Sequence, residues 1–192
     1  MAKAAKGAGT GGGGKVRGGR GSLDRHWHLA ATELEVGVTE LEFSILRVSA
    51  AFERWQGDCL GCCHGHTFSG TDTALLHVVR MHERPKSISE LSRLLKRDDL
   101  SNLQYSVRKL LKAGLIEKAR QAGSKKDVVY QMSPLGLEVT DQYAQFRKEL
   151  LMSLIEAAGG KIDFAASTRA LNVMSAMYDQ ASCVAATHRI SP

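Results

Sequence analysis

The sequence lacks the segments that carry proteins into or across membranes. It contains no run of about 18 consecutive apolar residues, so no segment is expected to span a bilayer. The charges near the N-terminus are not followed by an apolar stretch, so a secretory signal is not expected either. These absences predict a cytoplasmic protein, in which the four cysteines would stay reduced.

Motifs of the common catalytic sites are also missing. We find no nucleophile motif, no spaced pair of carboxylates and no internal repeat. The glycines near the N-terminus lack the preceding strand and the following helix that a phosphate-binding loop requires. The sequence therefore predicts that the protein is not an enzyme and that it requires no cofactor.

Positive charge is present, and it is concentrated in two segments. The chain carries a net charge of +6, and residues 1–22 contribute +5. This glycine-rich tail is expected to be disordered, and it could either attract phosphates or be dispensable. Residues 84–130, the basic block, hold twelve Lys and Arg against five acidic residues. A basic block in an otherwise acidic chain is typical of a nucleic-acid-binding surface, although a solvated charged face has the same composition.

Helical periodicity lies on both sides of the basic block. Apolar residues three and four apart predict a long helix over residues 23–55, which is followed by a short Cys/His-rich loop. A second helix is expected over residues 71–83. After the block, a Ser-Pro pair begins a helix over residues 133–158, and an aspartate begins the last helix, over residues 163–186.

Two short helices and a hairpin are expected within the basic block. Ser87 and Glu90 form a capping pair before the first helix. Asp98 and Asp99 offer N-cap chemistry for the second helix, which ends at Gly114. Two β-branched runs separated by a charged turn at 122–127 predict a β-hairpin with a basic tip. The expected fold class is mainly α with a small β-hairpin wing. The family resemblance described below implies that this is a winged helix-turn-helix with long N- and C-terminal dimerisation helices.

This fold class divides the chain into four parts. They are a disordered Gly/Lys-rich tail (1–22), an N-terminal dimerisation helix with the Cys/His loop (23–70), a winged helix-turn-helix DNA-binding lobe (71–136) and C-terminal dimerisation helices (137–192).

The second helix of the basic block has a polar outer face that suits the major groove of DNA. Amide side chains such as Gln104 pair with adenine, and Arg108 can contact guanine or a phosphate. The lysines are expected to contact phosphates, although the same face could simply keep a surface helix soluble. The predicted DNA-binding residues are Arg93, Ser101, Asn102, Gln104, Tyr105, Arg108, Lys109, Lys112, Lys125 and Lys126.

The chain resembles the MarR family of bacterial winged-helix transcription regulators over residues 25–188. The motifs that carry the resemblance are Ser89-Glu90-Leu91, Val107-Arg108-Lys109-Leu110, Ala113-Gly114-Leu115-Ile116-Glu117-Lys118, and Ser133 with Gly136. The resemblance implies a homodimeric repressor that binds an inverted-repeat operator and is released from it by a small aromatic acid. The whole chain is also similar to the nicotinate-catabolism repressors of that family, which respond to 6-hydroxynicotinate. The family's wing carries an arginine at its tip, whereas Ser124, Lys125 and Lys126 occupy this wing. Minor-groove readout is therefore expected to be weaker, or the wing is expected to attract phosphates only.

An aromatic acid would need a cation or hydrogen-bond donors and an apolar wall. The candidate ligand-binding residues are His26, Trp27, Arg54 and His77, although isolated His and Trp side chains are more often packed in a core than in contact with a ligand.

A cluster of cysteines and histidines leaves three alternatives open. Cys59, Cys62, Cys63, His64 and His66 have side chains of the kind that bind zinc, but a second distant ligand pair is not evident. Neighbouring thiols can also form a disulfide, and the cluster can equally be inert. A metal- or thiol-sensing regulator is therefore an alternative to a ligand-released repressor. A winged-helix interaction module without DNA binding is another.

Overall fold

The computed structural model describes residues 27–120, 128–159 and 162–188. The chain forms two compact units, one up to Ala51 and one from Phe52 onward, and helix α1 (Glu33–His64) runs through the boundary. In the first unit, the carboxylate of Glu35 accepts hydrogen bonds from the backbone N–H groups of Ala31 and Thr32, which fixes the start of α1. None of the helices in the described ranges combines the length and apolarity needed to cross a bilayer.

Helix α1 ends later than its sequence predicts. Gly57 does not terminate the helix. A glycine is required there because the backbone of Phe68 approaches closely: a Cβ atom on residue 57 would lie 2.7 Å from the carbonyl oxygen of Phe68. The helix continues to His64, and Gly65, with φ of +76°, ends it. The expected Cys/His loop is therefore wrong in its position, since Cys59 to His64 form the last turns of α1.

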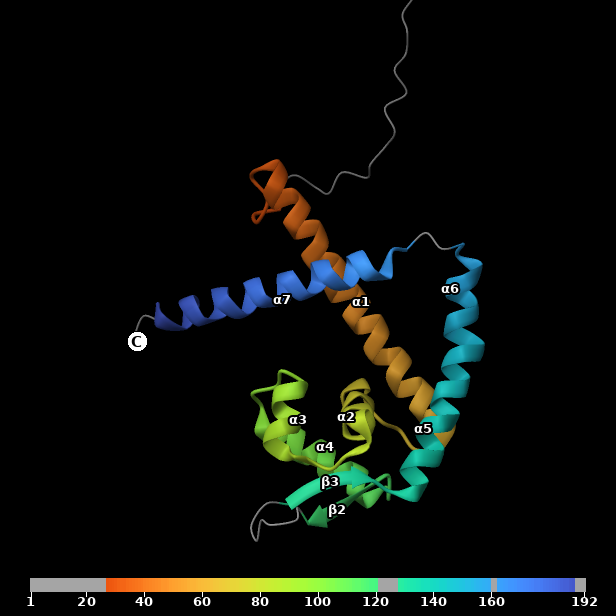
Figure 1. Cartoon of the computed structure of the whole chain (residues 1–192). Coiled ribbons are helices and arrows are strands. Elements are labelled where there is room, and N and C mark those ends of the chain that lie inside the picture. Colours follow the sequence, from red (N-terminus) through yellow and green to blue (C-terminus); the bar gives the residue numbers. More distant parts are fainter. Residues whose placement is uncertain (1–26, 121–127, 160–161, 189–192) are drawn as a thin grey trace, which may run out of the picture. The chain divides into compact units, whose positions relative to one another are not determined.

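The second unit contains a winged helix-turn-helix (Figure 1). It comprises α2 (Gly70–Arg80), the short 3₁₀ helix η1 (Met81–Glu83), β1 (Lys86–Ser87), α3 (Ile88–Leu94) and α4 (Leu100–Lys112). Ser87 and Asp99 each cap a helix as predicted, because each accepts a hydrogen bond from the third residue after it. The reciprocal half of the predicted Ser87–Glu90 pair does not form, since the Glu90 carboxylate binds Arg84. Gly114, with φ of +72°, follows the end of α4 as predicted.

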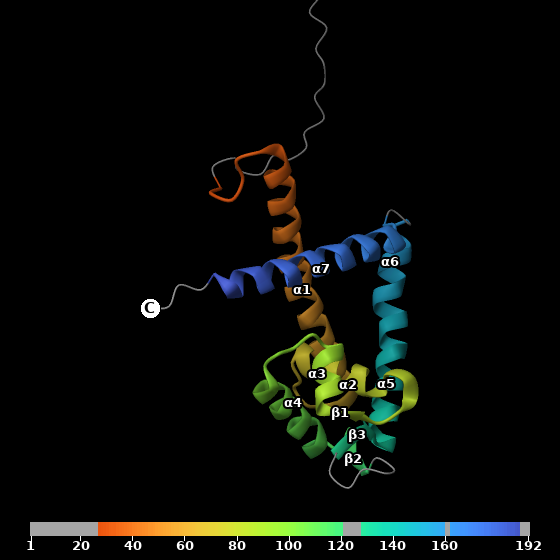
Figure 2. The same cartoon turned by 60° about the vertical axis from the view of Figure 1, so that its left-hand side comes forward.

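The wing is a three-stranded antiparallel sheet in the order β1-β3-β2, labelled in Figure 2. Strand β2 (Ile116–Arg120) pairs with β3 (Val128–Met132) as the predicted hairpin, with Ile116 opposite Met132. The sequence did not predict β1, whose two residues pair with Tyr130 and Val129 of β3. The hairpin tip that was predicted to be basic lies outside the described residues.

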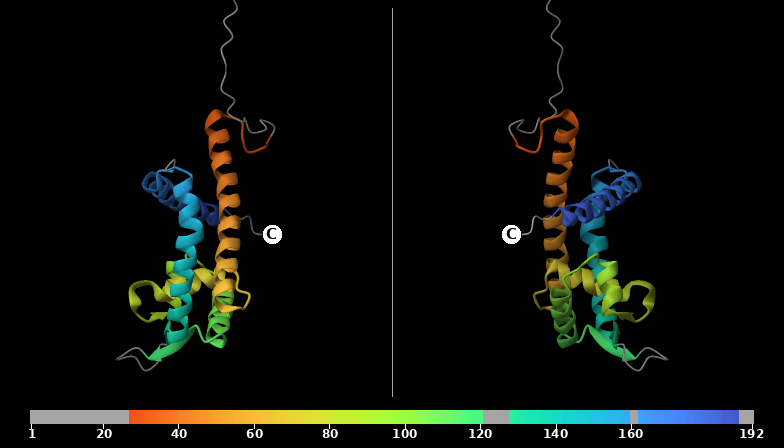
Figure 3. Two further views of the ribbon diagram at one scale, coloured as in Figure 1. Left: turned by 90° about the vertical axis from the view of Figure 1, so that its right-hand side faces the viewer. Right: turned by 90° about the vertical axis from the view of Figure 1, so that its left-hand side faces the viewer.

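The C-terminal part is helical. A π-helical turn, η2 (Arg147–Met152), continues α5 (Pro134–Phe146) into α6 (Ser153–Ala157), and the three form the continuous cyan rod of Figure 3. Helix α7 (Phe164–Thr187) follows, and Asp163 caps it as predicted. The mainly helical fold with a small wing is the predicted fold class, and its core is made of buried side chains from the C-terminal half of α1, from α2 to α5 and from β2, including Leu60, Leu75, Leu76, Leu91, Leu103, Leu110, Leu115 and Val139.

Candidate nucleic-acid interface

Helix α4 has two chemically distinct faces. Its inner face is buried in the core through Leu103, Val107 and Leu110. The opposite face is exposed and carries side chains that can donate and accept hydrogen bonds. The exposed predicted residues are Ser101, Asn102, Gln104, Tyr105, Arg108 and Lys112.

Asn102 also takes part in the N-cap of this helix. Its backbone N–H donates to the carboxylate of Asp99 at 3.0 Å, and its side-chain amide donates to the other oxygen of the same carboxylate. Both hydrogen bonds lower the pKa of Asp99 below its usual value, and the one from the backbone N–H has the larger effect. The cap contact uses one of the two N–H groups of the Asn102 amide, so the other N–H and the carbonyl oxygen remain for a further partner.

Lys109 is placed differently from its neighbours on α4. Its Nζ lies 2.7 Å from Oδ2 of Asp72 on α2 and 5.1 Å from the ring centroid of Phe68. The ammonium group is thus engaged within the fold, and the geometry does not support its predicted contact with a phosphate.

The other basic side chains also fall into two groups, those that form an ion pair within the described residues and those that do not. Lys96 binds Asp179 at 2.6 Å, whereas Arg93, Arg108 and Lys112 are exposed and form no ion pair with another described residue. The predicted wing residues Lys125 and Lys126 lie outside the described residues.

A notch of about 180 Å³ lies between α3, α4 and the wing. It brings Arg108 of the recognition face together with Lys118 of β2, and Gln104 and Tyr130 also line it. Sequence reasoning missed Lys118 as a candidate contact. Ile116 and Lys118 lie two residues apart on the same face of β2, so strand alternation gave no signal that sets the exposed Lys118 apart from the buried Ile116.

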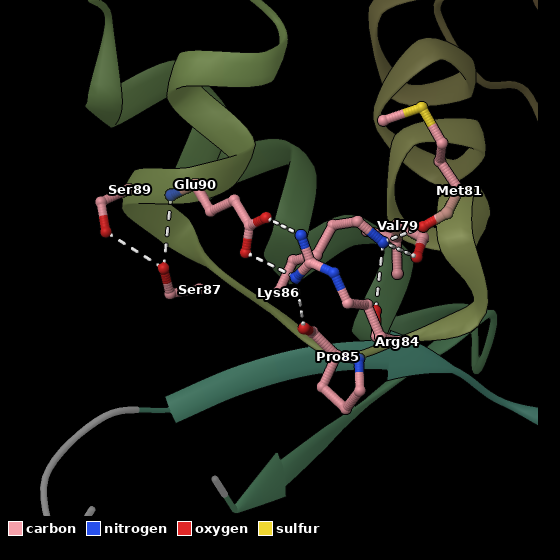
Figure 4. Close-up of polar contacts among 8 residues, drawn as sticks. All are labelled: Val79, Met81, Arg84, Pro85, Lys86, Ser87, Ser89 and Glu90. Carbon is pink, nitrogen blue, oxygen red and sulfur yellow. Dashed lines mark hydrogen bonds and ion pairs between the residues drawn. The ribbon is translucent and has the colours of Figure 1, made fainter.

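Buried Lys86 holds the segment that leads into α3 (Figure 4). Its side chain is fully buried, and Nζ donates to the carbonyl oxygens of Val79 at 3.0 Å, of Arg84 at 3.1 Å and of Met81. Burial lowers the pKa of Lys86. The ammonium group satisfies the carbonyl oxygens where α2 ends, and His82 and Glu83 turn the chain there with positive φ angles.

The guanidinium of Arg84 donates hydrogen bonds from both of its terminal nitrogens to the carboxylate of Glu90 on α3. Glu90 therefore pairs with Arg84, while Ser87 still caps the helix from the N-terminal side. Together, the contacts of Lys86 and Arg84 fix α3, the first helix of the helix-turn-helix, relative to α2 and the sheet. The fixed position of α3 supports α4, the next helix in the chain.

A larger pocket, of about 480 Å³, lies in the second unit between the end of α1, α2 and α5. Its aromatic walls are Trp55, His77 and Tyr143, and the last two rings meet edge to face at 4.4 Å. Two cations, Arg80 and Arg147, also line it. The guanidinium of Arg80 is held by Asp141 at 2.6 Å and by the hydroxyl of Thr140.

The four predicted ligand residues are not brought together. His77 lines this pocket, whereas Arg54 is exposed and does not line it. Trp27 packs against Phe43 within the first unit, with ring centroids 6.1 Å apart. His26 lies outside the described residues. Burial, and then the charge of Arg80, lower the pKa of His77, so this side chain is neutral at pH 7.

The Cys/His cluster does not assemble a metal-binding group. In the described ranges, no three His, Cys, Asp or Glu side chains come close enough together to hold a metal ion. The rings of His64 and His66 lie 4.9 Å apart, and Cys59 is buried. Burial raises the pKa of the Cys59 thiol to about 11 and also raises that of Cys63, which opposes formation of the reactive thiolate.

Comparison with known proteins agrees with this geometry. Residues 68–136 match the family model of the winged helix DNA-binding domain. The search of curated proteins found no match.

Several solved structures share the fold. MarR of Staphylococcus aureus in complex with salicylate and kanamycin is 16% identical, with a TM-score of 0.56 over 77% of this chain and 93% of that one. A cysteine-to-serine mutant of MarR from E. coli complexed with operator DNA is 19% identical, with a TM-score of 0.58 over 75% and 99%. The transcriptional regulator BldR from Sulfolobus solfataricus is 18% identical, with a TM-score of 0.59 over 76% and 99%. At these identities the likeness shows the fold.

Proposed function

We propose that the protein is a sequence-specific, DNA-binding transcription regulator of the MarR type. The observation that carries this proposal is the exposed polar face of α4, which presents Gln104, Tyr105 and Arg108 beside the wing. A helix of this kind inserts into the major groove, and the neighbouring cations contact the phosphates. The E. coli protein that was solved in complex with operator DNA has the same fold, which supports a DNA-binding role for this domain.

The regulator acts as a homodimer in this proposal. Helix α7 has no buried residue, and its large apolar side chains are exposed, which is costly in water unless another surface covers them. In the other unit, α1 also exposes large apolar side chains. A second copy covers these faces and presents two recognition helices to an inverted repeat. The exposed apolar residues include Leu34, Leu46 and Val48 on α1 and Phe164, Leu171, Val173, Met177 and Val184 on α7.

The effector that we propose is a small aromatic acid that binds the 480 Å³ pocket and releases the operator. The ring would lie against Trp55 and Tyr143, and the carboxylate would face Arg147. Nicotinate derivatives such as 6-hydroxynicotinate belong to this chemical class. Such a ligand acts as an effector only if it binds the DNA-bound and the free conformations with different affinities.

DNA binding is tested with duplexes selected from a random-sequence pool by the purified protein. We expect the selected sequences to form an inverted repeat with half-sites about one helical turn apart. Affinity should fall steeply with salt, because several phosphates per subunit are neutralised. An affinity that is flat between low and physiological salt would contradict the proposal.

The effector is tested by a thermal-shift screen of aromatic acids, nicotinate derivatives and zinc. A ligand of the folded state raises the melting temperature by mass action. We expect a shift with an aromatic acid, and the same compound should release the selected duplex. A shift with zinc alone would instead favour a metal-sensing regulator.

A further inference from the structure

We propose that the ion pair between Lys109 and Asp72 is a positioning device for the recognition helix. In this inference, which rests on the proposed DNA-binding function, Lys109 sets the affinity for the specific site without touching DNA. It does so by fixing α4 on α2, so that its exposed neighbours meet the bases and phosphates in the correct orientation.

The contact geometry separates Lys109 from a phosphate-binding lysine. Its Nζ is 2.7 Å from Oδ2 of Asp72, whose side chain is only 4% exposed. The ammonium group also lies over the ring of Phe68, which adds a cation–π contact. To reach a phosphate, Lys109 would have to leave an almost buried carboxylate without its partner, which is strongly unfavourable.

Asp72 is itself held rigidly by the start of α2. Its carboxylate accepts from the backbone N–H of Ser69 at 3.1 Å, and the hydroxyl of Ser69 accepts from the backbone N–H of Asp72 at 3.1 Å. The next residue, Thr73, donates to the carbonyl oxygen of Gln56 on α1 at 3.2 Å. Burial raises the pKa of Asp72, but hydrogen bonds from Lys109, Ser106 and Ser69 outweigh it and lower the pKa overall. The carboxylate is therefore a fixed, ionised anchor.

The position of Lys109 on α4 explains how this anchor reaches the DNA-binding face. Lys109 directly follows Arg108 and precedes Lys112 by three residues, so all three lie on one turn of the helix. Arg108 and Lys112 are exposed, while Lys109 is tied to α2. If the pair is lost, α4 can turn about its own axis, and such a turn displaces both exposed cations together.

A double-mutant cycle tests this inference. We compare Lys109→Met, Asp72→Asn and the double variant with Lys112→Met, which removes an exposed lysine from the same helix. Affinities for the selected duplex and for a scrambled duplex of equal length are measured as a function of salt. Circular dichroism gives the folded fraction of each variant.

We expect Lys109→Met and Asp72→Asn each to weaken binding of the selected duplex by about 5- to 30-fold. The double variant should be no worse than either single variant, because both remove the same interaction. The salt dependence should stay as in the wild type. Lys112→Met should instead weaken both duplexes alike and reduce the salt slope by about one.

Additive losses, or a reduced salt slope in Lys109→Met, would overturn the inference and make Lys109 a phosphate contact. If Asp72→Asn fails to fold because the cap of α2 is weakened, Lys109→Met and Lys109→Arg decide the question. Arginine should restore affinity, while the methionine variant keeps the wild-type slope. Absence of salt-dependent DNA binding by the wild type would instead overturn the proposed function, and this inference with it.

Discussion

His77 is a half-buried titratable side chain in the wall of the large pocket, and its buried Nε2 atom has no hydrogen-bond partner among the described residues. Burial and the charge of Arg80 lower its pKa below the value of about 6.5 expected in the unfolded chain. Well above pH 6.5 the imidazole is neutral in both states, so it contributes no pH dependence there. As the pH falls below 6.5, the unfolded state binds the proton first, and the folded state loses stability.

We therefore expect the free energy of unfolding to decrease between pH 7 and pH 5, and we expect His77→Phe to remove part of this decrease. Urea unfolding at a series of pH values measures it. His66→Gln, which changes an exposed histidine, is the control and should retain the wild-type profile. If the profiles of wild type and His77→Phe coincide, His77 is not kept neutral by the fold.

The thiols of the Cys/His cluster differ in exposure, and this difference tests the redox alternative. Cys59 is buried with a pKa of about 11, whereas Cys62 is exposed. With that pKa, only about one Cys59 thiol in a thousand is ionised at pH 8. In variants that retain a single cysteine, we expect Cys62 to react with a disulfide reagent far faster than Cys59. Rapid modification of Cys59 in the folded protein would revive a thiol-sensing role.

At the scale of elements, the contact between the start of α5 and the turn after α4 leaves no room for a side chain. A Cβ atom on Gly136 would lie 1.9 Å from the carbonyl oxygen of Leu115. The hydroxyl of Ser133 joins the same two segments, because it accepts from the N–H of Gly136 and donates to the carbonyl oxygen of Gly114. This junction connects the recognition helix α4 and the wing to helix α5.

Gly136→Ala should destabilise the fold by about 1–3 kcal/mol or more, because the backbone must move to accept the methyl group. Urea unfolding followed by circular dichroism measures the loss. Gly37→Ala is the matched control: a Cβ there meets nothing within 4 Å, and alanine in a helix should add up to about 1 kcal/mol of stability. Equal stability of the two variants would show that α5 tolerates a displacement at this junction.

Elements whose signals are local could be predicted from the sequence. Ser87, Asp99, Ser133 and Asp163 each begin a helix as expected, because a cap needs only its own hydroxyl or carboxylate and the next few residues. The true end of α1 could not be predicted, because Gly57 allows close approach of the Phe68 backbone and does not mark the end of the helix.

Features that depend on distant partners gave no local signal. Strand β1 exists through its pairing with β3, more than 40 positions along the chain. The partner of Lys109 lies 37 residues earlier. By periodicity alone, Lys109 is one of several lysines on a basic helix, so sequence reasoning grouped it with the phosphate contacts.

At the scale of the whole molecule, the proposed dimer depends on helix α7. Val173 and Met177 lie four residues apart on this helix, and their side chains are 54% and 57% exposed. Neither contributes to the core, so glutamate at both positions leaves the winged helix-turn-helix intact. Burying two carboxylates in the interface would be unfavourable, and we expect the double variant Val173→Glu/Met177→Glu to sediment as a monomer.

DNA binding provides the second measurement on this variant. A dimer gains affinity on a duplex with two half-sites because the second contact is intramolecular. The variant should therefore lose affinity for the two-half-site duplex and bind a single half-site as the wild type does. Asn172→Glu, which places a single carboxylate on another exposed face of α7, should remain a dimer. A glutamate variant that stays dimeric would place the interface on a different surface, and a monomeric wild type would contradict the dimer itself.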